Sequence, residues 1–460
     1  MSYDVIIVGC GPAGIFTALE LLKKEGLKIL MLDKGLDIER RVCPASRGLG
    51  CTKSCNPCSL LYGWGGAGAF SDGKLHLSPN VGGWLSEYRS VEELNKLADE
   101  VDYVWLRFGA PQLLYGTDLD AIDDIRRKAA SAGLELIPVK LRHMGTDKCG
   151  KILQAMREYL KPKVRMKMGT GVRKILVEKG RVVGVETEDG ETFYGRYVVL
   201  APGRGGSEWL SGEVQRLGLK TFANPVDLGV RVEVAAPIME PLTKVLYEPK
   251  FVFYSKSFDD RVRLFCVCPN GEVITELYND VVTVNGQSYA EKKTNNTNFA
   301  ILVSTAFTEP FKEPIAYGKY IARLANIIGG GVIIQRLGDL KRGRRSTVDR
   351  ISRSIVKPTL STAMPGDLSY VLPYRYLSDI LEMFDALEAV APGIAENHTL
   401  LYGVEVKFYS SRLELNKDLE TNIENLYAVG DGAGVTRSLS QASMSGIIAA
   451  KAILRKEGLP

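Results

Sequence analysis

Residues Tyr3 to Lys34 read YDVIIVGCGPAGIFTALELLKKEGLKILMLDK, and this stretch decides the fold. An apolar run over 5–8 precedes the glycine motif Gly9-x-Gly11-x-x-Gly14, and residues with helical spacing follow it. A second apolar run over 29–32 ends at Asp33, nineteen residues after the last glycine. This order predicts a strand, a glycine turn, a helix and a second strand, which is the start of a dinucleotide-binding domain.

The residue types of the motif indicate how a dinucleotide would bind. Gly9 permits the tight turn, Gly11 lets the backbone approach a pyrophosphate, and Gly14 lets the helix pack on the strand. The helix N-terminus directs amide groups and a partial positive charge at the phosphates. Asp33 is placed to accept a hydrogen bond from a ribose hydroxyl. The motif fits FAD and NAD equally, and its predicted contacts are Gly9, Gly11, Pro12, Ala13, Gly14, Asp33 and Lys34.

Composition is that of a globular protein with two or three domains: 460 residues, 45% apolar and 25% charged. A net charge of +5 is mild for this length, so nucleic acid is an unlikely partner. The first strand begins too early for a signal peptide, and no uncharged apolar stretch reaches membrane-spanning length. We therefore expect a cytoplasmic protein that does not bind membranes.

The remaining chain alternates between helical and strand patterns. Residues 91–132 have helical spacing, and residues 164–200 alternate with period two and end in an apolar run. Strand patterns dominate 227–305, and a long helix ends the chain. The sequence thus predicts an α/β fold with a Rossmann-like nucleotide-binding domain, formed by residues 1–224 and 403–460. Residues 225–402 are expected to form an inserted, strand-rich α+β substrate or cap domain.

Three segments resemble the FAD-dependent oxidoreductases of the glutathione reductase and hydroxybenzoate hydroxylase superfamily. They are the N-terminal motif, VVLAPG at 198–203, and NLYAVGDGAG at 425–434. Longer motifs, among them GWGGAGAFSDGKL and GDGAGVTRSLSQAS, resemble the uncharacterised FAD-dependent dehydrogenases over nearly the whole chain. The resemblance implies FAD as cofactor and a three-layer sandwich of two β-layers and one α-layer. It names no substrate, electron donor or oligomeric state.

The resemblance also implies roles for particular residues. Asp431 would accept a hydrogen bond from a ribityl hydroxyl, and a helix starting near Gly432 would point its amides at the flavin. The backbone of Val172 would meet the adenine edge. The glycine loop, 63–75, would lie against the isoalloxazine or pyrophosphate. The further cofactor contacts implied are Gly65, Gly66, Gly68, Ala201, Gly203, Gly430 and Gly432.

Four cysteines lie close together in a cysteine loop, 43–58: Cys43, Cys51, Cys55 and Cys58. This spacing predicts a zinc site or an iron–sulfur cluster, with a disulfide or inert thiols as alternatives. The three-then-two spacing is also found in radical S-adenosylmethionine enzymes, but the flavin-type segments argue against that class. Cys266 and Cys268 alternate along a predicted strand, so we expect both on one face and buried by packing.

Candidate catalytic residues are few, because the chain has three histidines and no apparent triad. Asp72 and Lys74 in the glycine loop and Arg437 near the final helix are candidates for orienting substrate or flavin. Lys407 is a further candidate. An arginine-rich segment between Gln335 and Arg353 is most simply a solvated surface, although it has the charge to clamp an anion or contact RNA.

The main hypothesis is an FAD-dependent oxidoreductase that transfers hydride or electrons between the flavin and a small or anionic substrate, with NAD(P)H as a possible donor. One alternative adds a second redox centre at the cysteine loop. Another is an RNA-binding flavoprotein that uses the arginine-rich segment.

Overall fold

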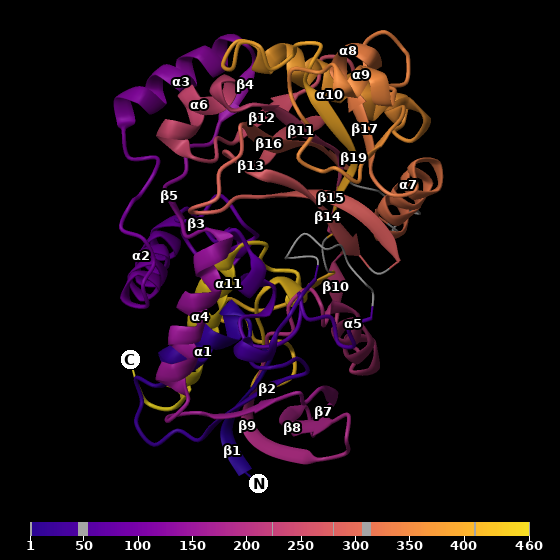
Figure 1. Cartoon of the computed structure of the whole chain (residues 1–460). Helices are drawn as coiled ribbons and strands as arrows, with labels where there is room; N and C mark the ends of the chain where they lie inside the picture. The colour runs from indigo at the N-terminus through magenta and orange to yellow at the C-terminus, as the bar shows by residue number, and fades with distance from the viewer. Residues whose placement is uncertain are drawn as a thin grey trace. The chain divides into compact units, whose positions relative to one another are not determined.

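The N-terminal stretch forms the predicted strand, turn, helix and strand in the computed structural model, which describes residues 2–44, 54–222, 224–278, 280–305, 314–408 and 411–459. Strand β1 (Ser2–Val8) runs through a glycine turn into helix α1 (Pro12–Leu21), and the chain returns in β2 (Ile29–Asp33), parallel to β1 (Figure 1). The expected α/β fold is confirmed.

The chain divides into two units. Unit 1 contains residues 1–112, 142–224 and 410–460, and unit 2 contains 113–141 and 225–409. These ranges differ from the expected ones in two places. Residues 113–141 group with unit 2, and the expected boundary after residue 402 falls inside β19 (Leu400–Lys407), which pairs with strands of unit 2.

Unit 1 is built around the parallel strands β6 (Arg165–Met168), β2, β1 and β9 (Thr192–Leu200), in that order, with β21 (Leu426–Ala428) beside the end of β9. An antiparallel meander of β7 (Val172–Glu178), β8 (Arg181–Thr187) and β9 continues the sheet. The further α-helices are α2 (Val91–Arg107), α4 (Thr146–Leu160), α5 (Ser207–Arg216) and α11 (Leu439–Lys456), and the 3-10 helices, labelled η, are η1 (Ile38–Arg40), η3 (Gly66–Phe70), η4 (Leu85–Glu87) and η6 (Asp431–Ala433). The further short strands are β3 (Lys74–His76), β10 (Thr221–Phe222) and β20 (Arg412–Leu413), and β5 (Leu141–His143) begins in unit 2 and ends in unit 1.

Alternation along β1 creates the three layers that the family resemblance implied. Val5 and Ile7 belong to a core shared with helices α1, α2, α4 and α11. Ile6 and Val8 belong to a second core shared with the meander. Because successive side chains of a strand point to opposite faces, one apolar strand serves both cores.

Unit 2 contains an eight-stranded sheet in the order β18 (Met364–Pro365), β17 (Ile333–Arg336), β19, β11 (Val226–Ala235), β16 (Asn296–Thr305), β13 (Arg261–Cys268), β12 (Phe251–Tyr254), β4 (Leu134–Leu136). A separate hairpin is formed by β14 (Glu272–Tyr278) and β15 (Val281–Gln287). Four helices share the apolar core on one face of the eight-stranded sheet: α3 (Leu119–Ser131), α6 (Ala236–Leu246), α7 (Pro314–Gly329) and α10 (Tyr374–Leu387). The remaining helices are α8 (Leu337–Leu340), α9 (Val348–Ser352) and the 3-10 helix η5 (Leu368–Tyr370).

Among the described residues, none of the helices combines the length and the apolarity that a membrane crossing requires.

Candidate functional site

Three distant chain segments leave the parallel sheet of unit 1 at the same edge. Val8 is the register partner of Leu200, and Leu200 is the partner of Ala428. The residues that follow, Gly9, Ala201 and 429–430, therefore lie together at the carboxyl ends of the strands. This edge is where α/β folds bind their ligands.

Glycines let these segments touch backbone to backbone. Gly9 has φ +108°, and a Cβ added to it would lie 2.0 Å from the carbonyl oxygen of Ala201. An added Cβ on Gly14 would lie 2.0 Å from the carbonyl oxygen of Gly9, and one on Gly432 would lie 2.5 Å from that of Gly203. These contacts exclude any side chain, so the three glycines are explained by packing within the protein.

Gly11 is a glycine that neither backbone nor packing explains. It is the N-cap of α1 with φ −78°, a conformation that any residue adopts, and as a glycine it provides no side-chain cap to this helix end. An added Cβ would meet only the Cα of Gly66, at 3.8 Å, which is ordinary contact. The space in front of Gly11 is therefore open to a ligand, beside the uncapped amides of a helix N-terminus, as a pyrophosphate requires.

Asp33 organises the turn in addition to any role towards a ribose. Oδ2 accepts from the amide of Cys10 at 2.8 Å, and Oδ1 accepts from the amides of Gly35 at 2.8 Å and Gly63 at 2.7 Å. Since a carboxylate oxygen can accept two hydrogen bonds, Oδ2 keeps the capacity to accept one from a ribose hydroxyl. Lys34 Nζ pairs with Glu188 at 2.7 Å, and its expected contact with the cofactor stays a prediction.

Arg41 holds the glycine loop, a role that no sequence pattern predicted. Its buried guanidinium donates to the carbonyl oxygens of Ser59, Leu60, Trp64 and Gly66. Burial lowers the pKa of Arg41 to about 10, against the opposing effect of the Asp33 charge. In the sequence, Arg41 is one member of a charged run, and its partners are backbone groups that no pattern marks.

The glycine loop reaches the helices that flank the sheet edge. Gly65 and Gly66 have φ +82° and +52°, which favour glycine. A Cβ on Gly68 would lie 3.0 Å from Leu439 at the start of α11 and 3.1 Å from Pro12 of α1. The loop therefore lies against both helix starts, and Ala13 of α1 meets Gly430, whose added Cβ would be 3.1 Å away.

Asp431 lies in the turn after β21, where Oδ1 accepts from the Thr436 hydroxyl at 2.7 Å. Burial raises the pKa of Asp431, and the Thr436 hydrogen bond and the charges of Arg204 and Arg437 oppose this. The long helix expected to begin near Gly432 begins later. Asp431–Ala433 form only the 3-10 helix η6, capped by Gly434 (φ +76°), and α11 begins at Leu439, capped by Ser438.

Two buried polar side chains at the start of α11 were not predicted as site residues from the sequence. Ser440 Oγ and Gln441 Oε1 have no hydrogen-bond partner among the described residues, and both residues are fully buried. The Gln441 amide is held by Nε2, which donates to the carbonyl oxygens of Pro79 and Val81. Because buried polar atoms normally find a partner, these two atoms indicate a ligand or bound water. The polar motif SLSQAS at 438–443, which contains both residues, was the feature of the sequence that could have indicated them.

Val172 begins β7, where it pairs with Thr187 of β8, and its side chain is buried in the core beneath the meander. Its expected backbone contact with adenine stays a prediction.

The charged candidates divide into two sets. Lys74 Nζ lies 2.9 Å from Asp72 Oδ2, and both side chains are largely buried. The guanidinium of Arg437 lies 3.7 Å from the centre of the Trp84 ring. Their expected roles in orienting substrate or flavin stay predictions.

The cysteine loop is only partly described. Cys51 lies outside the described residues; Cys43 is buried, Cys58 is half-buried and Cys55 is exposed, and none of these three forms a disulfide. Among the described side chains, the one set placed to share a metal ion does not include them. The zinc or iron–sulfur centre therefore stays untested.

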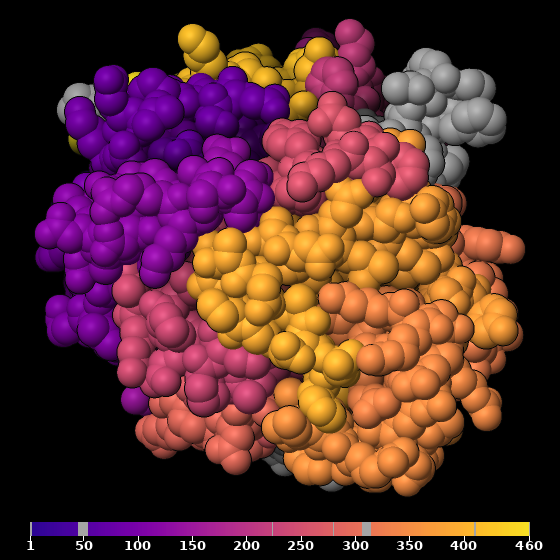
Figure 2. All heavy atoms as spheres, turned by 90° about the horizontal axis from the view of Figure 1, so that it is seen from above, coloured from indigo at the N-terminus to yellow at the C-terminus, as the bar shows by residue number. Residues whose placement is uncertain are grey.

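The arginine-rich segment lies at the surface around α8 and α9, in orange in Figure 2. Several of its cations are used internally: Arg336 and Arg344 pair with Asp339, and Arg342 donates to the carbonyl oxygen of Gly338. These contacts support the solvated-surface interpretation over RNA binding.

Comparisons with known proteins place this geometry in a family. An uncharacterized protein of Clostridium beijerinckii is 26% identical and is matched over 99% of this chain and 81% of its own length. Glycine oxidase from Geobacillus kaustophilus is 14% identical, with 99% of this chain and 95% of that chain covered and a TM-score of 0.39. The FrdA subunit of E. coli quinol fumarate reductase is 14% identical, with 100% and 71% covered and a TM-score of 0.43.

Two family models match. The model described as FAD-dependent protein, C-terminal domain-like, matches residues 241–408. The model described as FAD dependent oxidoreductase matches residues 4–264, more than half of the chain. The chain therefore belongs to the FAD-dependent oxidoreductase family, and FAD is its cofactor.

Proposed function

We propose that this oxidoreductase binds FAD along the carboxyl edge of the unit 1 sheet, with the pyrophosphate at 9–14, the adenosine ribose at Asp33 and the ribityl chain at Asp431. The open space at Gly11 carries the proposal, because a glycine that the protein itself does not need is explained by a ligand that occupies the position of its Cβ. When bound, FAD supplies the transfer of hydride or electrons.

The residues of unit 1 supply binding and orientation. The uncapped N-terminus of α1 stabilises the pyrophosphate charge. The raised pKa of Asp431 reflects burial of a carboxylate, and a ligand hydroxyl that donates to it would compensate that burial. Ser440 Oγ and Gln441 Oε1 provide further polar atoms, and neither has a hydrogen-bond partner in the described part of the chain.

We propose that the substrate is a small molecule bound by unit 2. In support, the sheet of unit 2 buries the charged residues Arg231 and Glu405, and the half-buried Lys407 pairs with Glu405. Buried charges are characteristic of functional sites more than of stability. A screen of candidate substrates and donors, including NADH and NADPH, under anaerobic conditions identifies the reaction by bleaching of the flavin absorbance. If no reductant bleaches the bound flavin, the enzyme does not act by flavin reduction.

The orientation of FAD is tested with its fragments. ADP contains the adenosine and pyrophosphate that we place at Asp33 and Gly11, so ADP should compete with FAD for the apoprotein, whereas riboflavin should compete far less. The measurement is FAD uptake followed by quenching of flavin fluorescence. Competition by riboflavin alone, with no effect of millimolar ADP, would contradict the placement.

A further inference from the structure

Strand β13 of unit 2 is interrupted at a pair of cysteines. Its pairing with β16 steps from Phe265 opposite Ala300 to Cys268 opposite Asn298, so three steps on β13 match two on β16. This extra residue is a β-bulge. Cys266 lies in it with φ +50°, a left-handed conformation that is uncommon outside glycine and that recurs at functional sites.

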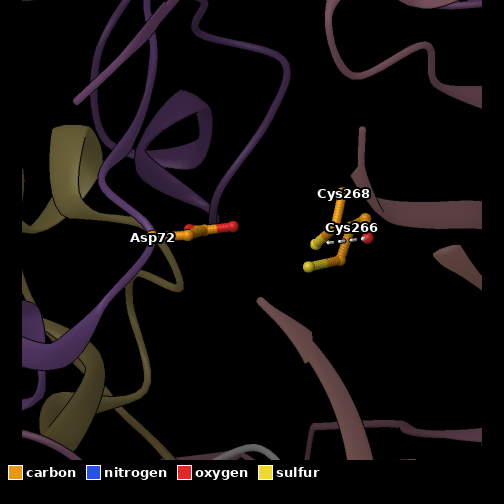
Figure 3. A group of neighbouring side chains, drawn as sticks. All are labelled: Asp72, Cys266 and Cys268. Carbon is orange, nitrogen blue, oxygen red and sulfur yellow. Dashed lines mark hydrogen bonds between the residues drawn. The ribbon is translucent and has the colours of Figure 1, made fainter. Parts of the chain in front are cut away.

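The bulge leaves the two thiols close together. Their sulfur atoms lie within 4.8 Å of each other, and Figure 3 shows the side chains next to one another. Neither forms a disulfide. Cys268 is fully buried, as expected, but Cys266 is only half-buried, so the expectation of simple packing fails for it. Of the two residues, Cys266 is thus the one that retains exposed surface.

A buried arginine fixes the inner thiol. Arg231 on β11 is fully buried, and its Nη2 donates to the carbonyl oxygen of Cys266 at 2.7 Å and to Cys268 Sγ at 3.2 Å. Asn298 Oδ1 accepts from Nε and Nη2 of the same guanidinium at 2.8 and 2.6 Å. The guanidinium therefore cannot turn away from the sulfur of Cys268.

Further charged residues near Arg231 come from β19 and from the hairpin of β14 and β15. Glu405 lies 3.5 Å from Arg231 Nη1 and 3.0 Å from Lys407 Nζ, and Lys407 also lies 3.5 Å from Glu276. Two cations and two carboxylates are thus grouped beside the cysteines. Pure packing of two small apolar side chains requires none of these groups, since a buried ion network stabilises a fold little or not at all.

We propose that Cys266 and Cys268 form a thiol–disulfide exchange pair that reduces small disulfides. The Cys266 thiolate attacks one sulfur of a disulfide RSSR, which forms a mixed disulfide and releases RS⁻. The Cys268 thiolate then attacks Cys266 Sγ, which forms the 266–268 disulfide and releases the second RS⁻. Two electrons pass from the cysteines to the external disulfide, and the two thiol protons end on the two released thiols.

The burial of each thiol defines the substrate class. Cys268 has no exposed surface, so an external disulfide reaches it only through Cys266. Cys266 is itself half-buried, which admits a small disulfide such as oxidised glutathione more readily than a disulfide within a folded protein. This activity requires no FAD, and it is separate from the cysteine loop at 43–58.

Peptide mass spectrometry of the full-length protein tests the proposal. Reduced, desalted protein is incubated anaerobically with oxidised glutathione, quenched in acid, alkylated and digested with trypsin. Residues 264–292 form one tryptic peptide that contains both cysteines and no others. In the wild type this peptide should escape alkylation and have the mass of the unalkylated dithiol peptide less two hydrogen atoms. Cys268→Ala should instead accumulate a glutathione adduct on Cys266, and Cys266→Ala should show neither product.

The exposed Cys55 reports non-specific reaction with glutathione in the same samples. The matched control variant is Cys149→Ala, which removes a buried thiol that donates a hydrogen bond to the carbonyl oxygen of Gly68. Circular dichroism checks that each variant is folded. A wild-type peptide that stays fully reduced while Cys55 forms adducts would overturn the proposal. So would a wild-type Cys266 adduct as persistent as that of Cys268→Ala.

Discussion

Gly11 and Gly14 are chemically identical, but the same substitution should act differently at each. Gly14→Ala places a Cβ 2.0 Å from a carbonyl oxygen, so we expect the apoprotein to lose about 2 kcal/mol or more of unfolding free energy. Gly11→Ala meets nothing closer than 3.8 Å, so the apoprotein should change by no more than about 0.5 kcal/mol. Its dissociation constant for FAD should nevertheless rise roughly tenfold or more, about 1.4 kcal/mol.

Urea unfolding of both apoproteins and fluorescence titration with FAD measure the two effects. Gly11→Ala is the informative variant, because its fold is intact. If it binds FAD as tightly as the wild type, the space at Gly11 does not hold the pyrophosphate.

Helix α10 contacts the turn between β12 and β13 at Asp260. Arg375 of α10 forms an ion pair with Asp260, and the buried carboxyl group of Asp379, also on α10, lies next to the same aspartate. Burial and the neighbouring Asp260 raise the pKa of Asp379 to about 6 from its ordinary value of 3.8. The folded state holds this proton more tightly than the unfolded state, so protonation of Asp379 adds to the free energy of unfolding. This stabilisation is complete below pH 3.8 and is lost as the pH rises to about 6.

Asp379→Asn keeps the shape of the protonated side chain and should not lose this contribution. Its unfolding free energy relative to the wild type should therefore increase between pH 4 and 6, by roughly 2 kcal/mol, and stay constant above pH 7. Urea unfolding of both proteins at intervals of half a pH unit measures the difference. A difference that is flat across this range, or that falls as the pH rises, would exclude a raised pKa at Asp379.

Elements whose signals are local could be predicted, and contacts formed by tertiary packing could not. The glycine spacing and the apolar runs predicted β1, α1 and β2, because each signal lies within a few residues of its element. Helix α3 was also expected as a helix, but its apolar residues Ile122, Ile125 and Ala129 pack in the core of unit 2. An amphipathic pattern shows which face is buried and not what buries it. The carbonyl contacts of Arg41 were equally invisible, since a backbone oxygen carries no sequence signature.

The positions of the tryptophans allow the unfolding of one unit of the molecule to be followed on its own. All four, Trp64, Trp84, Trp105 and Trp209, lie in unit 1. Tryptophan fluorescence therefore follows the unfolding of unit 1, where we place FAD. At a hundredfold excess of FAD over its dissociation constant, binding adds about 2.7 kcal/mol. The thermal midpoint seen by fluorescence should rise by roughly 5 °C or more. An unchanged midpoint in saturating FAD would place the cofactor outside unit 1.

We infer that FAD binds at the sheet edge formed by Gly9, Gly11, Ala201 and Asp431. The most direct measurement is the FAD content of refolded protein. Wild type and Gly11→Ala are unfolded, freed of ligand, refolded with excess FAD and desalted, and bound flavin is then measured by its absorbance. We expect one FAD per wild-type chain and clearly less on Gly11→Ala. Two results would contradict this placement of FAD. One is wild-type protein that refolds but retains no flavin, and the other is an equal flavin content in refolded wild type and Gly11→Ala.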